Sequence, residues 1–197
     1  IGVFTVIAYP NISNWINDRN VKKEVYDVVT YIKERKLEVT NDKYGMIQLS
    51  LKPNLEVYTM SKKNFINTLS ISCFSFTKIA YLASSLMKNG GGLVTLSFYG
   101  ANKVMPNYNV MGVAKAALET SVKYLSVDLG NKNIRVNAIS AGPMRTLAGA
   151  AVSNAREVYK YTKHNSPLKR NVQLDELGNT ALYFVSDLSK AVSGEIH

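Results

Sequence analysis

From residue 64 onward, helical and strand patterns alternate along the chain, and this alternation constrains the fold more than any other feature. Two apolar runs have the length and composition of buried strands. Parallel strands joined through helices give an open twisted sheet that is covered on both faces. The sequence therefore predicts an α/β fold with a doubly wound parallel sheet. The predicted strands are 93–98 and 134–140, and the predicted helices are 64–88, 108–129, 148–163 and 175–186.

The first 60 residues repeat this pattern less clearly. Residues 2–8 are predicted to form a buried first strand, and residues 22–35 have the spacing of an amphipathic helix. Residues 37–40 and 46–51 are candidate short strands. Because no linker, repeat or low-complexity segment interrupts the 197 residues, one domain is expected.

Cysteine use and hydropathy exclude several classes of protein. The single cysteine, Cys73, cannot form an internal disulfide, and its apolar surroundings predict a small buried side chain. No basic region followed by an apolar core opens the sequence, so no secretory signal is expected. No apolar run reaches the length of a membrane span. These features favour a cytoplasmic protein without a membrane segment.

The chain carries a net charge of +10, from 24 Lys and Arg against 14 Asp and Glu. Such an excess is typical either of a solvated surface or of a docking face for an acidic protein partner. The lysines are scattered, and no nucleic-acid reader motif is present, so nucleic acid is not an expected partner. No metal site is indicated.

Tyr108 and Lys115 follow the first of the two clear strands and are seven residues apart, which is two helical turns. Ligands of parallel sheets bind beyond the carboxyl ends of the strands, here near Ser97 and Ser140. An ammonium beside a phenol is expected to lower the phenol's pKa. The phenol can then donate to an oxygen that gains charge when a hydride arrives. With 12 tyrosines and many lysines in the chain, spacing alone leaves a simple packing role open.

The sequence around this pair resembles one family. The segments from Thr95 to Ala101, from Met105 to Glu119 and from Asn133 to Ala148 are similar to the bacterial-type NADH-dependent enoyl-acyl carrier protein reductases. These are divergent short-chain dehydrogenases of fatty acid synthesis, with six residues between the tyrosine and lysine instead of three. The resemblance covers residues 61–197. It implies a Rossmann-like fold, NADH as cofactor, an enoyl chain on acyl carrier protein as substrate, and a homotetramer.

The resemblance also implies roles for individual residues. Tyr108 and Lys115 match the catalytic pair, and Lys115 would also hold the ribose hydroxyls. Ser97 is assigned to the same cofactor site, and Phe98 stands where the family has a second tyrosine. Phe98 keeps the ring and loses the hydroxyl, so a packing role remains for it. The nicotinamide half of NADH is expected to contact the loop residues Met144, Arg145, Thr146, Leu147 and Ala148.

The cofactor-binding half matches the family less well. Ser13 and the pair Glu38–Val39 resemble phosphate and adenine contacts, but Val6 stands where a glycine turn is wanted. Residues 1–60 are thus expected to be a degenerate cofactor half and residues 61–197 the catalytic half of a truncated or internally deleted reductase, with strands missing. Two alternatives stay open: an inactive remnant or structural subunit, and another short-chain dehydrogenase such as a 3-ketoacyl reductase.

Overall fold

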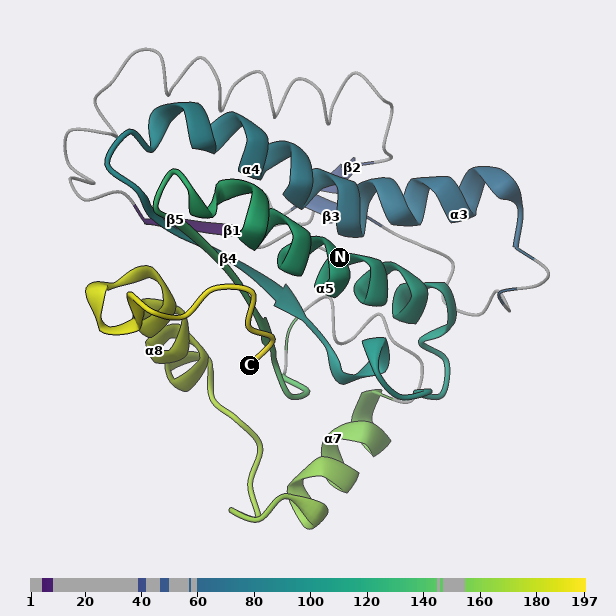
Figure 1. Cartoon of the computed structure of the whole chain (residues 1–197). Helices are drawn as coiled ribbons and strands as arrows, with labels where there is room; N and C mark the ends of the chain where they lie inside the picture. The colour runs from purple at the N-terminus through teal and green to yellow at the C-terminus, as the bar shows by residue number, and fades with distance from the viewer. Residues whose placement is uncertain are drawn as a thin grey trace.

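Two parallel strands form the centre of the protein. The structure, a computed structural model, describes residues 5–8, 39–41, 47–49, 57, 60–144, 146 and 155–197. In it β4 (Gly91–Ser97) pairs in parallel with β5 (Ile134–Ser140), and Ser97 lies opposite Ser140. Both strands therefore end at the same edge of the sheet (Figure 1). The helix α5 (Asn109–Gly130) joins them, and all three elements lie within two residues of their predicted bounds.

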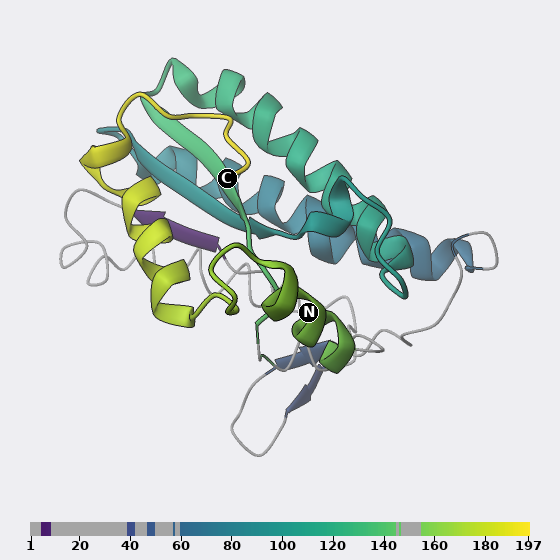
Figure 2. The same cartoon turned by 90° about the horizontal axis from the view of Figure 1, so that it is seen from below.

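Helices cover both faces of this pair (Figures 1 and 2). A helical run of α3 (Lys62–Leu69), the π-helical η2 (Ser70–Phe74) and α4 (Ser75–Leu86) lies with α5 on one face. The helix α8 (Leu174–Val185) lies on the other face. This two-sided cover confirms the predicted doubly wound α/β fold.

The alternation of strand side chains explains the two cores. Leu93 and Val136 belong to the core under α4 and α5, which also contains Phe76 and Val122. The other face forms a smaller core, whose buried members are Val94, Ile139 and Phe184. Neighbouring strand residues point to opposite faces, so one short strand supplies both cores.

The run from α3 to α4 is the long helix predicted for residues 64–88, with one π-helical turn in its middle. The run is 25 residues long, and an 18-residue window of it has a mean hydropathy of 1.2, which would suit a membrane-crossing helix by length and composition. Of that window, 22% is buried. Core helices meet the same criterion. Here Phe76 and Ala80 are fully buried against the sheet, and Cys73 packs against this core but is half-buried instead of fully buried as predicted.

The early strands differ from the parallel arrangement expected. β1 (Thr5–Ala8) pairs antiparallel with β4, with Thr5 opposite Thr95. β2 (Val39–Asn41) and β3 (Ile47–Leu49) pair with each other in a second antiparallel sheet, and among the described residues neither pairs with another strand. Strand direction depends on tertiary placement, because side-chain alternation is the same in both directions. The helix predicted for residues 22–35 lies outside the described residues.

Beyond α7 (Ala155–Asn165) and α8, the chain returns to the sheet. The Ala138 N–H donates to the Glu195 carbonyl at 2.8 Å, and the His197 N–H donates to the Ala138 carbonyl at 3.0 Å. Buried Asn137 holds this segment by donating to the Val192 carbonyl and accepting from the Glu195 N–H, both at 3.0 Å. Residues 194–197 therefore run parallel to β5, with a bridge between Ala138 and Ile196.

Candidate active site

Tyr108 lies at the entry to α5, one residue before the helix begins. Its carbonyl accepts from the Met111 N–H at 2.9 Å and the Gly112 N–H at 3.3 Å, so its backbone already belongs to the helical ladder. The flanking Asn107 and Asn109 have φ values of 62° and 36°. Asparagine is among the few residues that tolerate this left-handed region. The sequence around Tyr108 thus suits the abrupt turn that presents it.

The Tyr108 ring packs closely against the turn after β4. Its centroid lies 4.9 Å from that of Phe98, with the rings tilted by 58°. A Cβ on Gly100 would lie 2.8 Å from Cε1 of this ring, and a Cβ on Gly112 would lie 2.8 Å from the Gly100 carbonyl oxygen. Only glycine allows this contact of ring, turn and helix. Phe98 therefore supports the Tyr108 ring, while the neighbouring Tyr99 is 53% exposed.

Lys115 reaches from α5 to the same strand end. Its Nζ donates to the Leu96 carbonyl at 2.7 Å. Burial lowers the pKa of Lys115 to about 8, while Cys73 and then Glu119 act in the opposite direction by favouring the ammonium. The group thus remains mainly protonated at neutral pH.

The electrostatics of Tyr108 differ from the expectation that Lys115 lowers its pKa. Burial raises the pKa of the Tyr108 phenol, because a phenolate would lose its hydration among Phe98 and Gly100. The ammonium of Lys115 instead donates to a backbone carbonyl. Tyr108 is accordingly a neutral phenol at physiological pH, suited to donating a hydrogen bond.

Glu119 is a buried charged residue that the sequence reasoning missed. It is 8% exposed, and its two carboxylate oxygens accept separate hydrogen bonds. Ser97 Oγ donates to Oε1 at 2.5 Å, and Asn102 Nδ2 donates to Oε2 at 2.9 Å. Ser97, predicted to contact the cofactor, thus directs its hydroxyl to Glu119. The available signal was the four-residue spacing from Lys115, which puts both side chains on one helical face.

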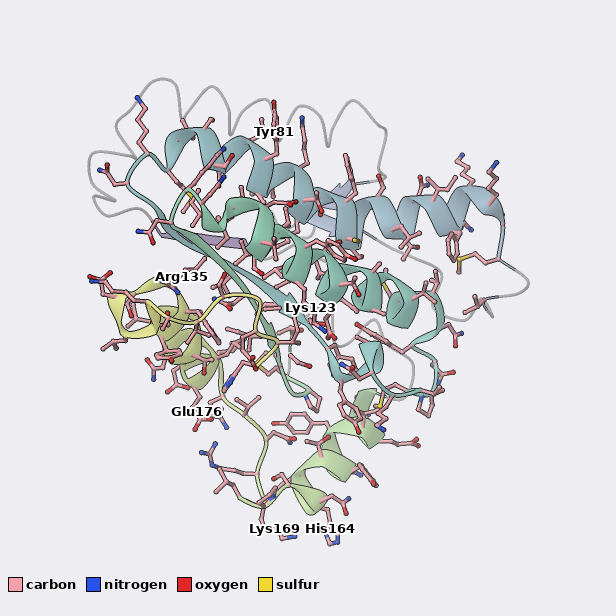
Figure 3. All side chains as sticks on the ribbon, in the orientation of Figure 1. Tyr81, Lys123, Arg135, His164, Lys169 and Glu176 are labelled. Carbon is pink, nitrogen blue, oxygen red and sulfur yellow. The ribbon has the colours of Figure 1, made fainter. Side chains whose placement is uncertain are left out.

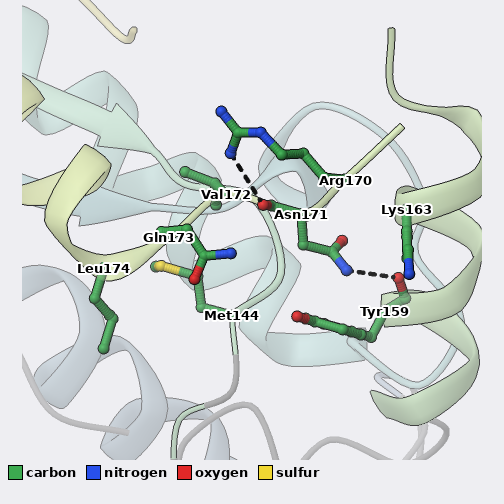
Figure 4. A pocket seen from close by; sticks show the side chains of 8 residues that line it. All are labelled: Met144, Tyr159, Lys163, Arg170, Asn171, Val172, Gln173 and Leu174. Carbon is green, nitrogen blue, oxygen red and sulfur yellow. Dashed lines mark hydrogen bonds between the residues drawn. The ribbon is translucent and has the colours of Figure 1, made fainter. Parts of the chain in front are cut away.

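The loop after β5 lines a separate cavity of about 460 Å³ (Figure 4). Of the predicted nicotinamide contacts, Met144 lines this cavity, and the Thr146 N–H donates to the Met144 carbonyl at 2.9 Å. Neither Tyr108 nor Lys115 is among the lining residues, which are Met144, Tyr159, Lys163, Arg170, Asn171, Val172, Gln173 and Leu174. The predicted contacts outside the described residues are Ser13, Glu38, Arg145, Leu147 and Ala148, while Val39 lies in β2.

Comparison with known proteins identifies the family of the chain. The profile of a family described as enoyl-(acyl carrier protein) reductase matches residues 18–197. The chain belongs to this family. Over 137 residues it is 58% identical to enoyl-acyl-carrier-protein reductase (NADH) 1 of Rhizobium meliloti, covering 70% of this chain and 50% of the relative. Reductase (NADH) 2 of the same organism is 53% identical over 172 residues, or 86% of this chain and 64% of the relative.

Solved structures of this reductase family share the fold. The enzyme of Candidatus Liberibacter asiaticus is 46% identical with a TM-score of 0.73, covering 91% of this chain and 69% of that one. The Anaplasma phagocytophilum reductase, solved in complex with NAD, is 45% identical with a TM-score of 0.71. The match covers 89% of this chain and 69% of that one. The present reductase-family chain spans about half to two-thirds of the curated relatives it matches.

Proposed function

We propose that this chain reduces a trans-2-enoyl thioester on acyl carrier protein to the saturated acyl thioester, with NADH as the reductant. The observation that carries the proposal is that α5 and its N-terminal cap present a neutral, half-buried Tyr108 phenol and the Lys115 ammonium. Both lie at the edge where β4 and β5 end, where parallel sheets bind ligands. Two relatives named above are NADH enoyl reductases.

In this proposal the described residues serve the nicotinamide side of NADH, which would supply the hydride. Among these residues, the Leu96 carbonyl takes one of the three N–H donors of Lys115, which leaves donors for ribose hydroxyls. Met144 and Thr146, on the loop after β5, would contact the nicotinamide half. In the cofactor half of residues 1–60, Ser13 would serve the pyrophosphate, and Glu38 with Val39 the adenine end.

In this reaction the protein must stabilise an enolate. When the β-carbon of the enoyl chain gains hydride, negative charge moves to the thioester oxygen. Tyr108 donates its phenolic hydrogen bond to that oxygen, and the positive charge of Lys115 stabilises the same charge through space. The α-carbon then takes a proton. Burial of both groups strengthens these interactions, because little water competes for them.

Loss of NADH absorbance with a crotonyl thioester tests the assignment. Tyr108→Phe and Lys115→Ala should each lower kcat by about 100–10,000-fold. The matched controls Tyr124→Phe and Lys123→Ala alter exposed side chains of the same helix and should leave kcat unchanged (Figure 3 labels Lys123). Full activity in both site variants would overturn the proposal.

The same assay separates the alternatives. An inactive remnant or structural subunit would neither oxidise NADH nor bind it in a calorimetric titration. A different short-chain dehydrogenase would reduce a 3-ketoacyl thioester in preference to the enoyl thioester. The proposed enzyme binds NADH and prefers the enoyl substrate.

Acyl carrier protein is the proposed partner, and α7 with the turn after it carries exposed basic side chains, of which Figure 3 labels Lys169. Carrier proteins are acidic, so charge complementarity would steer this encounter. Raised salt should increase KM for a carrier-bound enoyl chain more than KM for a small crotonyl thioester. Equal salt dependence for both substrates would contradict docking there. The exposed basic residues proposed for this docking are Arg156, Lys160, Lys163 and Lys169.

We also propose a homotetramer that uses exposed apolar side chains of the α3–α4 run. Ile66, Phe74 and Tyr81 are 52%, 47% and 68% exposed there, and apolar surface of this kind is typical of interfaces. Light scattering after size exclusion should give four times the chain mass. Tyr81→Glu should shift the population to smaller species, whereas a wild-type protein that is monomeric at every concentration would refute the tetramer.

A further inference from the structure

We propose that Glu119 is a positioning residue of this site, whose buried carboxylate clamps the turn behind Tyr108 and keeps the Lys115 ammonium at the end of β4. The catalytic consequence rests on the function proposed above. The clamp itself rests on hydrogen bonds, burial and charge that the structure shows directly.

One carboxylate holds both ends of the turn that supports Tyr108. Ser97, the last residue of β4, donates to Oε1, and Asn102, the residue after η3 (Tyr99–Ala101), donates to Oε2. Between these two anchors lie Phe98 and Gly100, the residues against which the Tyr108 ring packs. Glu119 therefore sets the position of the surface that supports the phenol without touching the phenol.

The same carboxylate also fixes α5 relative to β4. Lys115 donates to the Leu96 carbonyl, and one helical turn later Glu119 accepts from Ser97, the next strand residue. Two successive strand residues are thus tied to two helix positions on one face. A slide of α5 along β4 would break both bonds, so the pair holds the Lys115 ammonium at the strand end.

The negative charge of Glu119 also affects the protonation of Lys115. Lys115 has Cys73 from η2, Glu119 from its own helix and the Leu96 carbonyl from β4 around it. Glu119 and Cys73 both favour the ammonium against the effect of burial. A glutamine at position 119 would keep one acceptor oxygen but present an N–H₂ group to the Asn102 amide. It would weaken the clamp and remove the charge together.

The test compares Glu119→Gln and Glu119→Asp with Asp128→Asn, which removes one exposed charge from the same helix. Competitive acetylation, resolved at Lys115 by mass spectrometry across pH, needs no cofactor. Its midpoint should fall by about 0.5–1 pH unit in Glu119→Gln, because the ammonium loses a nearby countercharge. The midpoint should stay unchanged in Asp128→Asn and change little in Glu119→Asp, which keeps the charge.

Kinetics provide the second measurement. Glu119→Gln should lower kcat by about 10–100-fold, because the turn that supports Tyr108 shifts. Asp128→Asn is the reference variant, and its thermal stability should be unchanged. Ser97→Ala and Asn102→Ala should lower kcat but leave the acetylation midpoint of Lys115 unchanged. If Glu119→Gln does not fold, these two variants still test whether the hydrogen bonds to Glu119 hold the turn. An unchanged midpoint and kcat in Glu119→Gln, or unchanged kcat in both donor variants, would overturn the clamp. If the wild-type chain does not oxidise NADH, the proposed function fails, whereas the Lys115 midpoint still decides the role of Glu119.

Discussion

Gly100→Ala is the change that most directly probes the Tyr108 site. The added Cβ would lie 2.8 Å from Cε1 and 3.3 Å from Cγ of the Tyr108 ring, closer than carbon atoms pack. The turn cannot retreat toward α5, because the Gly100 carbonyl already lies against Gly112. The Tyr108 ring must therefore move away from the turn, and its hydroxyl moves with it.

Movement of the Tyr108 ring should lower both Tm and kcat. Overpacking of this kind costs about 1–3 kcal/mol, which lowers Tm by roughly 2–12 °C in a chain of this size. A displacement of about 1 Å at a reacting group costs about 100-fold in rate. We expect kcat for NADH oxidation to fall by that factor, with Tm read from circular dichroism on the same samples.

Gly178→Ala is the matched control. Gly178 lies within α8, is exposed and has no atom within 4 Å of an added Cβ. Alanine there should raise the free energy of unfolding by about 0.5–1 kcal/mol and leave kcat unchanged. If Gly100→Ala keeps both wild-type Tm and wild-type kcat, the close packing of ring and turn is not what places Tyr108.

Three further changes test the electrostatics and the chain end. The folded-state pKa of Lys115, about 8, lies below its ordinary 10.5. Between pH 8 and 10.5 this group therefore binds a proton more often in the unfolded than in the folded chain, so its contribution raises the free energy of unfolding as pH rises through that range. Urea unfolding across that range should show this rise in wild type and its loss in Lys115→Met. Arg170 holds the pKa of Glu176 at about 2, below 4.5, so stability from this pair should be lost as pH falls from 4.5 through 2. Thermal melts of Arg170→Ala should lack that part of the acid dependence. Asn137→Ala should cost about 1–3 kcal/mol and speed amide exchange at residues 194–197, which a stability assay and exchange mass spectrometry can measure.

The local pattern of the chain predicted much of the catalytic half. Alternation of apolar residues located β4, β5, α5 and α8, because each element's own residues determine its period. The sequence segments around Tyr108 and Lys115 indicated the family that the profile match then showed. The same segment contains Glu119, whose spacing from Lys115 indicates a shared helical face but does not show that the carboxylate is buried.

What the sequence by itself determined is therefore local: the kind of element formed by β4, β5, α5 and α8, and a tyrosine and a lysine two turns apart at one edge of a parallel sheet. Only the tertiary structure decided the antiparallel pairing of β1, the raised pKa of Tyr108 and the clamp formed by Glu119. Each of these depends on atoms far apart in sequence. Strand direction needs a partner strand, desolvation needs a closed environment, and a buried carboxylate needs donors from two other elements.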